Sequence, residues 1–588
     1  QYNETLWNRQ LIEGGTINPG SGVAPPVPGS TPLCPTGLTI RDGGNPSLYT
    51  GVQDRSDWPV GLDAVPEGYF YAPDDPDLVA PTPTNLVPYA DAPQYPGLLD
   101  RANQPFQAAG LDVPGYVLFG NHDGLVQGNA YASKLFNELA QGCPKPVADA
   151  SQNGGQPTGS LYALILNPDL TESQFLDLYN NNEDLFTGVP PDPDRRLISK
   201  KQYMDVFKEN GQDNGHGFGF VDPAEATASN GSAGYYSWSP SPGIRYVTLD
   251  THSEGGKILV SDNGNLDTPQ FNWYESVLQK AEEDNEIVVT FSHHAVTSLT
   301  ADVLDENAPL CANVNPAEVV GCDADPRDSA PIKLTADVKA MVLKYPNMVA
   351  WVAGHSHENE ITPFKNPEGE GGFWSIRTAA LADWPKQNRL LQIFDNHDGN
   401  LSIFGTLIDE ASPVPTPAPG TSAASFTTDQ LASISREIGY NDSQNGGRQC
   451  SPDPCGEGTV ADRNVELLIK DPRRPVVPPP SAAKISKVQV LPKKKTLKAG
   501  KKTKLTVKVT NSGGTAAKNV KVNLKSTNKR VKVKKSVTIK NVPAGKTVSV
   551  KVTVTAKSKA KGKAKVTASA KGKKGSSTLK IKAKKRRK

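Results

Sequence analysis

The chain has 588 residues, which is more than a single domain usually holds. Its formal net charge of +2 at pH 7 hides two oppositely charged parts. Residues 481–588 contain 36 Lys and Arg and no Asp or Glu, which leaves 28 basic and 62 acidic residues in 1–480. This balance of +36 against −34 indicates that the two parts meet different surroundings or partners. No apolar run approaches the ~20 residues that a membrane-spanning helix needs, so the sequence predicts no such helix.

The six cysteines lack zinc-ribbon spacing. Two local pairs, Cys311 with Cys322 and Cys450 with Cys455, leave Cys34 and Cys143 over. An even count in local pairs favours disulfides in an exported protein, and free buried thiols are the alternative.

The first part of the chain alternates predicted helices with a long insertion. A helix is predicted at 4–13, ended by Gly14-Gly15. Residues 16–112 are dense in Pro, Gly and Asp, which indicates a long insertion that either caps a site or decorates the surface. Further helices are expected at 129–139, 171–179, 199–209, 270–283, 336–343 and 428–438.

Three predicted strands end in turns that carry histidine. The apolar runs are 115–119, 287–291 and 348–353, followed by Gly-Asn-His-Asp at 120–123, Ser-His-His at 292–294 and Gly-His-Ser-His at 354–357. Each run is rich in β-branched residues and bounded by Gly or Ser, which predicts a buried strand. Because open α/β sheets bind ligands beyond the carboxyl ends of their strands, five of the eight histidines are expected at one site.

These residue types suit a metal site with nitrogen and oxygen ligands. Neutral imidazole binds Zn, Mn, Fe or Ni, and the amide oxygen of Asn121 adds a ligand without charge. In an extended segment, the alternate spacing of His355 and His357 points both rings the same way. The alternative for any one of them is a core histidine satisfied by a hydrogen bond.

In this order, Gly-Asn-His-Asp, His-His and Gly-His-x-His resemble the later motifs of the calcineurin-like metallophosphoesterases, over roughly residues 1–475. The resemblance implies an α/β core of four layers, in which two packed β-sheets are flanked by helices. It also implies hydrolysis of phosphate esters at two divalent metal ions, such as Mn, Fe or Zn. Strands at 374–378, 390–394 and 401–407 are expected to close the second sheet.

The resemblance also implies metal ligands. Asn121, His293 and His355 would bind one ion, and His357 would bind the other. His293 is chosen over His294 because the family places its ligand first in this motif.

The same resemblance assigns the proton chemistry. His122 would act as general acid on the leaving group, and Asp123 would orient it. Substrate contacts are also expected at Arg195 and Arg196, which could hold a phosphate by forked hydrogen bonds or simply begin a solvated helix, and at His216 in a glycine-rich loop.

Two motifs of the family are not found upstream of Gly120. The family begins with Asp-x-His and Gly-Asp-x-x-Asp. This chain opens instead with Gln-Tyr-Asn-Glu at 1–4, which resembles the segment that follows those motifs in a secreted bacterial branch of the family. We therefore expect an N-terminally truncated fragment whose signal peptide is in the missing part, and a secreted or cell-surface protein. Asp250 and His252 match Asp-x-His in the wrong order, so a structural strand end is the preferred interpretation there.

Beyond the predicted core of 1–410, residues 411–473 form an extension typical of that branch, with a linker at 411–422 and a strand at 462–468, and 474–483 form a Pro-rich linker. In 484–588, seven strands are predicted, at 484–491, 502–511, 519–526, 535–539, 547–555, 563–568 and 577–581. Their spacing favours an antiparallel β-sandwich, and the turns resemble bacterial cell-adhesion-like, immunoglobulin-type modules.

The basic module either binds nothing or attaches to an anionic wall polymer, a membrane surface or nucleic acid. Nucleic acid is the weakest of these because no aromatic residues interleave with the lysines.

For the whole chain, the sequence predicts a phosphate-ester hydrolase, incomplete in this fragment. The alternatives are a phosphodiesterase acting on nucleotides or lipid headgroups, and a non-catalytic cell-wall-binding or adhesion protein.

Overall fold

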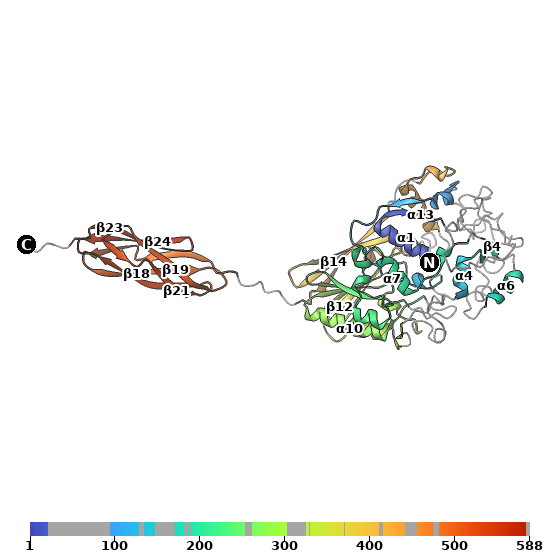
Figure 1. Cartoon of the computed structure of the whole chain (residues 1–588), viewed down its shortest axis with the longest axis horizontal. Helices are drawn as coiled ribbons and strands as arrows, with labels where there is room; N and C mark the ends of the chain where they lie inside the picture. The colour runs from blue at the N-terminus through green and yellow to red at the C-terminus, as the bar shows by residue number, and fades with distance from the viewer. Residues whose placement is uncertain are drawn as a thin grey trace, which may run out of the picture. The chain divides into compact units, whose positions relative to one another are not determined.

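The computed structural model divides the chain into two compact units, Gln1–Arg474 and Pro475–Lys588, which are described separately (Figure 1). The residues that it describes are 1–20, 95–126, 128, 134–146, 171–181, 186–188, 191–252, 262–302, 325–327, 330–369, 371–410, 416–441, 456–473 and 481–583. Most of the predicted insertion and five of the six cysteines lie outside these ranges. Cys143 lies within them and is disulfide-bonded. No helix in these ranges is long and apolar enough to cross a membrane.

The centre of the first unit is a six-stranded sheet with the strand order β11-β12-β10-β8-β6-β5. Its strands are β5 (Tyr236–Ser241), β6 (Ile244–Thr248), β8 (Ile287–Phe291), β10 (Met348–Ala353), β11 (Glu360–Lys365) and β12 (Gly372–Arg377). The four inner strands are parallel and the two edge strands antiparallel. The carboxyl ends of β6, β8 and β10 therefore meet at the same edge of the sheet.

A second, antiparallel sheet packs against the first. It contains β13 (Gln387–Asp395), β14 (Asn400–Asp409) and β15 (Val465–Lys470) in that order. Ile287 and Val289 of β8 share a buried cluster with Leu401 and Ile403 of β14, so side chains from both sheets fill the space between them. The strand predicted at 374–378 was placed in the wrong sheet, because β12 pairs in parallel with β10.

Helices cover the other face of the six-stranded sheet. Val288 points away from its neighbours in β8 and packs with α10 (Thr268–Glu283) and α12 (Thr335–Val342). The Asp267 side chain accepts a hydrogen bond from the Gln270 amide (2.7 Å) and so begins α10 as an N-cap. The unit is thus a mixed α/β fold with helices on one sheet and a second sheet behind it.

The remaining predicted helices of this unit are present with slightly different ends, except that residues 129–133 of the helix predicted at 129–139 lie outside the described residues. They are α1 (Tyr2–Glu13), α4 (Lys134–Gln141), α6 (Glu172–Asn181), α7 (Lys200–Lys208) and α13 (Thr428–Asn441). The described ends of the insertion are joined by β1 (Gly15–Ile17) and β2 (Phe106–Ala108), in which Gly15 lies opposite Ala108. Shorter elements are α2 (Leu98–Ala102), α3 (Asn121–Gly124), β3 (Pro144–Pro146), β4 (Phe186–Gly188), α8 (Asp213–His216), α9 (Pro223–Ala228), β7 (Leu266–Asp267) and β9 (Ile332–Lys333).

The strand predicted at 115–119 is wrong. This segment has no regular secondary structure and no strand neighbour among the described residues. Its polar backbone groups are bound instead by the short helix α8 and by side chains: the Val117 amide donates to the His216 carbonyl (3.0 Å), and the Tyr236 hydroxyl donates to the Val117 carbonyl (2.7 Å). The apolar character of this segment could be recognised from the sequence, but its backbone hydrogen bonds are not made with a neighbouring strand.

The second unit consists of two β-sheets around one apolar core (Figure 1). One sheet has the order β16-β18-β22-β20 and the other β17-β24-β23-β19-β21. The strands are β16 (Ile485–Leu491), β17 (Lys494–Lys498), β18 (Lys502–Asn511), β19 (Ala517–Ser526), β20 (Val531–Val533), β21 (Ser536–Val542), β22 (Thr547–Ala556), β23 (Gly562–Ala570) and β24 (Lys573–Lys582). All seven predicted strands are confirmed. The prediction missed β17 and β20, and β17 pairs in parallel with β24 rather than antiparallel.

Candidate metal centre

Histidines from two neighbouring parallel strands meet at the carboxyl edge of the sheet. His293 and His294 follow β8, and His355 follows β10. Their ligand nitrogens all lie within 4.8 Å of one another. The ring centroids of His293 and His355 are 5.2 Å apart, and those of His294 and His355 are 4.3 Å apart. These side chains, separated by about sixty residues in sequence, form one cluster.

Asn121 completes this cluster from a third segment. Its Oδ1 lies 2.7 Å from His293 Nε2, and its Nδ2 donates to the Gly128 carbonyl at 2.9 Å. Because the amide nitrogen is bound to Gly128, the oxygen is held toward the ring. Gly120 allows this approach, since a Cβ at that position would lie 2.9 Å from His293 Nδ1.

The surroundings of these three imidazoles lower their pKa values and so keep them neutral. Burial, followed by the neighbouring His294 and His355, lowers the pKa of His293 to about 2. Burial and His355 also lower the pKa of His294 to about 4. The pKa of His355 is lowered by burial, with the carboxylate of Asp262 acting in the opposite direction. Neutral imidazoles are the form that binds metal ions.

His294 belongs to the cluster, although the sequence favoured His293 as the ligand. His294 Nε2 lies 2.8 Å from the Asp262 carbonyl and so donates to it, which leaves Nδ1 to accept from the Thr251 hydroxyl at 2.9 Å. Both nitrogens of His294 therefore have partners outside the cluster, whereas His293 Nε2 is hydrogen-bonded within it, to Asn121 Oδ1. The adjacent His-His pair was the only signal for His294, and Thr251 and Asp262 carried no signal that we recognised.

The backbone at Gly-His-Ser-His differs from the expected extended segment. His355 and His357 have φ values of 70° and 55°, so both occupy the left-handed region that non-glycine residues rarely adopt. Such strain is concentrated at functional sites. The His357 ring lies beside Asp383, with Nδ1 2.5 Å from Oδ2, and Asp383 is a further residue that sequence reasoning missed.

His122 and Asp123 lie on the short helix α3 next to Asn121. His122 is exposed, and its ring packs on Gly128, where an added Cβ would lie 2.5 Å from Nε2. The Asp123 carboxylate accepts a hydrogen bond from the Gly120 amide at 2.8 Å. Averaged over the whole residue, Asp123 is half-buried, whereas its carboxyl group is enclosed by protein. The burial of the carboxyl group raises its pKa to about 6. The hydrogen bond to Gly120 indicates that Asp123 holds the turn that carries His122.

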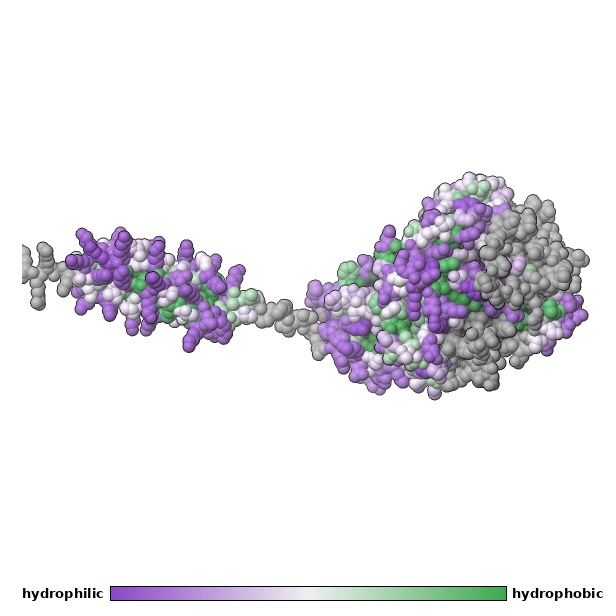
Figure 2. Space-filling view, viewed as in Figure 1, coloured by the Kyte–Doolittle hydropathy of each residue, from purple (hydrophilic) through white to green (hydrophobic). Residues whose placement is uncertain are grey.

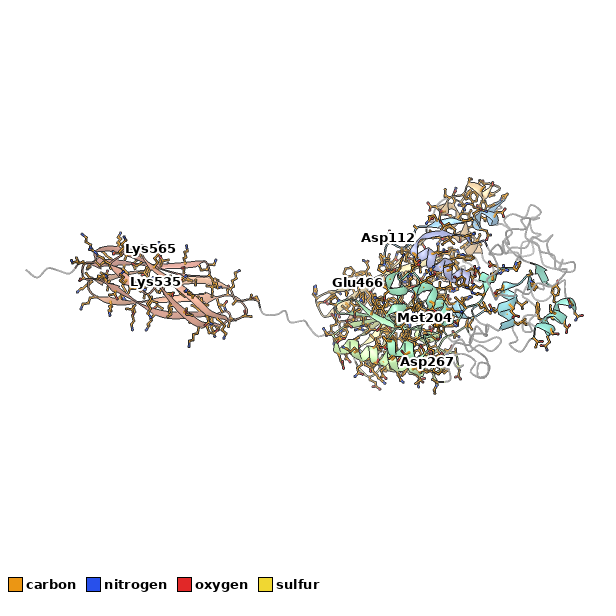
Figure 3. All side chains as sticks on the ribbon, viewed as in Figure 1. Asp112, Met204, Asp267, Glu466, Lys535 and Lys565 are labelled. Carbon is orange, nitrogen blue, oxygen red and sulfur yellow. The ribbon has the colours of Figure 1, made fainter. Side chains whose placement is uncertain are left out.

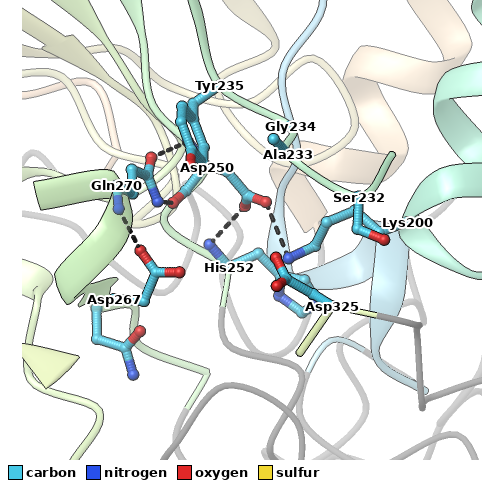
Figure 4. Close-up of a pocket in the computed structure, with 11 residues that line it drawn as sticks. Lys200, Ser232, Ala233, Gly234, Tyr235, Asp250, His252, Asp267, Gln270 and Asp325 are labelled. Carbon is cyan, nitrogen blue, oxygen red and sulfur yellow. Dashed lines mark hydrogen bonds and ion pairs between the residues drawn. The ribbon is translucent and has the colours of Figure 1, made fainter. Parts of the chain in front are cut away.

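A polar pocket lies behind this turn (Figure 4). Lys200 Nζ and Asp250 Oδ2 form a buried ion pair at 3.0 Å, and the His252 amide donates to Asp250 Oδ1 at 3.1 Å. The His252 ring packs against Gly124 of α3, where an added Cβ would lie 2.3 Å from its Nε2. Asp250 and His252 thus support the turn from behind, in agreement with the structural interpretation of this strand end.

The three residues expected to contact substrate have other contacts in the structure. The Arg195 guanidinium donates to the carbonyls of Ala140 (2.9 Å) and Gly142 (3.3 Å). Arg196 pairs with Asp194 at 2.7 Å and lies over the Tyr2 ring. His216 is fully buried, with Nδ1 2.8 Å from the Gly115 carbonyl and Nε2 3.2 Å from Glu13. These contacts stabilise the fold, and we assign no substrate role to the three residues.

The side chains in this cluster fit a divalent metal ion. The imidazoles of His293 and His355 converge with the amide oxygen of Asn121, beside His294, and these ligand types suit Mn, Fe or Zn. Asp262 is close enough to affect the pKa of both His294 and His355, so a carboxylate is also present nearby.

The comparisons with known proteins concern mainly the basic module. Residues 497–573 match a family model described as the NPCBM-associated, NEW3 domain of alpha-galactosidase. No curated protein matches the chain. Among solved structures, the chain is similar to the CARDB domain of the PF1109 protein from Pyrococcus furiosus, with 14% identity, 17% of this chain and 96% of that chain covered, and a TM-score of 0.15.

Other solved structures resemble different parts of the chain. A dimetal phosphatase from Danio rerio is 16% identical, with 36% of this chain and 65% of the phosphatase chain covered, and a TM-score of 0.23. The chain therefore spans slightly less than two thirds of that phosphatase. Domains 4 and 5 of the S-layer protein SbsC are 17% identical, with 21% and 62% covered and a TM-score of 0.14. Likeness at these identities concerns the fold alone.

Proposed function

We propose that the first unit is a metal-dependent phosphoesterase whose centre is the cluster of Asn121, His293 and His355. The observation that carries this proposal is the 2.7 Å approach of Asn121 Oδ1 to His293 Nε2 beside the His355 ring. An amide oxygen and an imidazole nitrogen from distant segments, both of which can serve as metal ligands, are held within hydrogen-bond distance of each other, beside neutral imidazoles, at the carboxyl ends of parallel strands. A shared divalent cation accounts for this convergence better than separate core histidines do.

The residues of the chain have distinct parts in this proposal. A divalent cation bound there would act as a Lewis acid on a phosphoryl oxygen. His122 is exposed beside Asn121, where its ring can donate a proton to the leaving oxygen, an effect typically worth ~10²–10⁴-fold. Asp123 keeps the turn in place through the Gly120 amide, so that His122 and Asn121 face the same side of the site.

The finer features are also part of the proposal. We propose two ions, with His357 serving the second beside Asp383. A four-layer core would place a further layer on the outer face of the three-stranded sheet, where Leu390, Phe394 and Leu468 are exposed among the described residues. Export is supported by the disulfide at Cys143, since such bonds persist in oxidising surroundings. The substrate class is a phosphate monoester or diester, including nucleotide and lipid headgroup diesters.

The test measures metal content and turnover with the full-length protein. Metal bound after exposure to Mn²⁺, Fe²⁺ or Zn²⁺ is quantified by elemental analysis, and hydrolysis is followed with p-nitrophenyl phosphate and bis(p-nitrophenyl) phosphate. His293→Ala should lose bound metal, and His122→Ala should retain metal but lose at least about tenfold in kcat. His397→Ala is the matched control, because its side chain is 86% exposed on the β13–β14 turn.

The outcomes separate the alternatives. Metal binding without turnover of either ester would favour the non-catalytic adhesion protein. Equal metal content in His293→Ala and His397→Ala would remove the basis of the proposal. The ratio of diester to monoester turnover distinguishes the phosphodiesterase from the monoesterase.

A further inference from the structure

The basic module contains a groove of about 300 Å³ between strand β16 and the start of strand β24. β16 is an edge strand of one sheet, and β24 belongs to the other. The polar residues that line the groove are the four lysines Lys487, Lys493, Lys573 and Lys574, together with Ser486, Gln489 and Ser576. Four lysines, two serines and one glutamine therefore border one concave surface.

The backbone around this groove is fixed by hydrogen bonds between distant segments. The Thr578 amide donates to the Lys493 carbonyl at 2.8 Å, and the Ser577 hydroxyl donates to the Pro492 carbonyl at 2.6 Å. Gly575 packs directly on β16, because a Cβ there would lie 2.3 Å from the Val488 carbonyl oxygen. The lysines are thus carried by a pre-formed surface rather than by a free loop.

The charge of the groove has no acidic counterpart in the module. Residues 481–588 contain no Asp or Glu, so the lysines around the groove cannot be neutralised from within the module. Like charges on one concave surface repel each other and attract anions from solution. Phosphate oxygens are commonly bound by lysine together with Ser or Thr hydroxyls, which is the combination present here.

The rest of the module indicates what kind of anion it meets. Figures 2 and 3 show hydrophilic side chains projecting from both long sides of the module. Lysines lie on the outer faces of both sheets and alternate with hydroxyls across strands, as in Lys504 opposite Thr553 and Lys565 opposite Thr578. A flat membrane would meet only one of these faces, whereas a linear polymer can meet both.

Two other partners fit less well. The exposed large apolar side chains of the described residues all precede residue 470, so the described module offers none for insertion into a bilayer. Residues 481–588 also contain no Phe, Trp or Tyr on which nucleic-acid bases could stack.

We propose that the groove lined by Lys487, Lys493, Lys573 and Lys574 binds phosphate groups of a linear anionic polymer at the cell surface. The remaining lysines add weaker, non-specific attraction along the same polymer. Lysine supplies 33 of the 36 basic residues of 481–588, and its compact charge suits repeated, salt-sensitive contacts better than one oriented contact.

The test compares two variants of the full chain with the same loss of charge. The groove variant carries Lys493→Gln, Lys573→Gln and Lys574→Gln, and the control carries Lys504→Gln, Lys532→Gln and Lys551→Gln on the exposed face of the four-stranded sheet. Binding to linear polyphosphate is measured by titration at several salt concentrations, in EDTA so that hydrolysis cannot consume the probe. This readout does not depend on the proposed esterase.

Counterion release predicts the size of the effect. If each groove lysine contacts one phosphate, the slope of log K against log salt should fall by about 2, and affinity at 0.15 M salt should fall by roughly 50-fold, at ~0.7 ions per contact. The control variant should lose less than about threefold. Equal losses in the two variants would overturn the groove as the site, and so would unchanged binding of the groove variant. Tighter binding to phosphatidylglycerol vesicles, or to polyglutamate, than to polyphosphate would overturn the proposed partner.

Discussion

The buried ion pair of Lys200 and Asp250 allows a direct test of how the Asn121 turn is supported. The two side chains are 6% and 4% exposed, and their charged atoms are 3.0 Å apart. Lys200→Met removes one partner and leaves the Asp250 carboxylate in a buried site, where the His252 amide remains as a donor. Breaking a buried pair in this way typically costs about 3–5 kcal/mol of unfolding free energy.

The neighbouring residue provides a matched control. Lys201 also pairs with a carboxylate, that of Asp205 at 2.5 Å, but both side chains are about half exposed, at 51% and 52%. Surface pairs of this kind contribute little, so Lys201→Met should change the unfolding free energy by no more than about 0.5 kcal/mol. The two substitutions are identical in chemistry and differ only in burial.

Urea unfolding followed by tryptophan fluorescence measures this difference in the full chain. All seven Trp residues precede residue 385, so the signal reports the first unit alone. Lys200→Met should lower the urea midpoint clearly, and Lys200→Met with Asp250→Asn should recover most of the loss because the uncompensated charge is removed. The reasoning is refuted if Lys200→Met behaves like Lys201→Met, or if the double variant is no more stable than Lys200→Met alone.

Three further predictions concern the metal centre itself. Adding Mn²⁺ or Zn²⁺ to metal-free protein should raise Tm, because binding to the folded state at a concentration 100-fold above Kd adds about 2.7 kcal/mol to the unfolding free energy. His293→Ala should abolish this rise. His294→Ala should lower the Tm of the metal-free protein more than His293→Ala does. The reason is that the Thr251 hydroxyl and the Asp262 carbonyl each lose a hydrogen-bond partner, which costs about 1–3 kcal/mol of unfolding free energy per buried group. A larger loss of Tm in His293→Ala would contradict the assigned roles. Gly120→Ala should weaken metal binding at least about tenfold by displacing the His293 ring, which calorimetry would show, whereas Gly369→Ala, with open space around it, should not.

Much of the local structure could be predicted from the sequence. The helix α10 and the strands β8 and β10 were located to within about three residues, since their apolar periodicity and N-cap signals are local. The order of strands was less accessible. β12 was assigned to the second sheet because a strand's own residues do not say which neighbour it pairs with. The strand predicted at 115–119 is wrong for the same reason, because its backbone partners come from the short helix α8 and a tyrosine.

The site shows the same division between local and distant information. Asn121, His293 and His355 stand in short motifs, so the sequence could name them together. The residues that hold them could not be named, because their relations depend on the fold. Thr251 and His294 are 43 residues apart, and the partners of Arg195 are more than 50 residues away. Adjacent arginines therefore suggested a phosphate contact, while in the structure the Arg195 guanidinium is bound to backbone carbonyls.

One further signal was present in the sequence and becomes interpretable only with the structure. Glycines recur every four residues around the Asn-His-Asp turn, at 120, 124 and 128, and each faces a different histidine ring. An added Cβ would lie 2.9 Å from His293 Nδ1 at Gly120, 2.3 Å from His252 Nε2 at Gly124, and 2.5 Å from His122 Nε2 at Gly128. One of these rings belongs to the turn itself and two come from distant parts of the chain, so the glycines set how closely the three imidazoles can pack against the turn that carries Asn121. The conformational freedom of glycine matters only at Gly128, where φ is +79°, and at the other two positions the requirement is space.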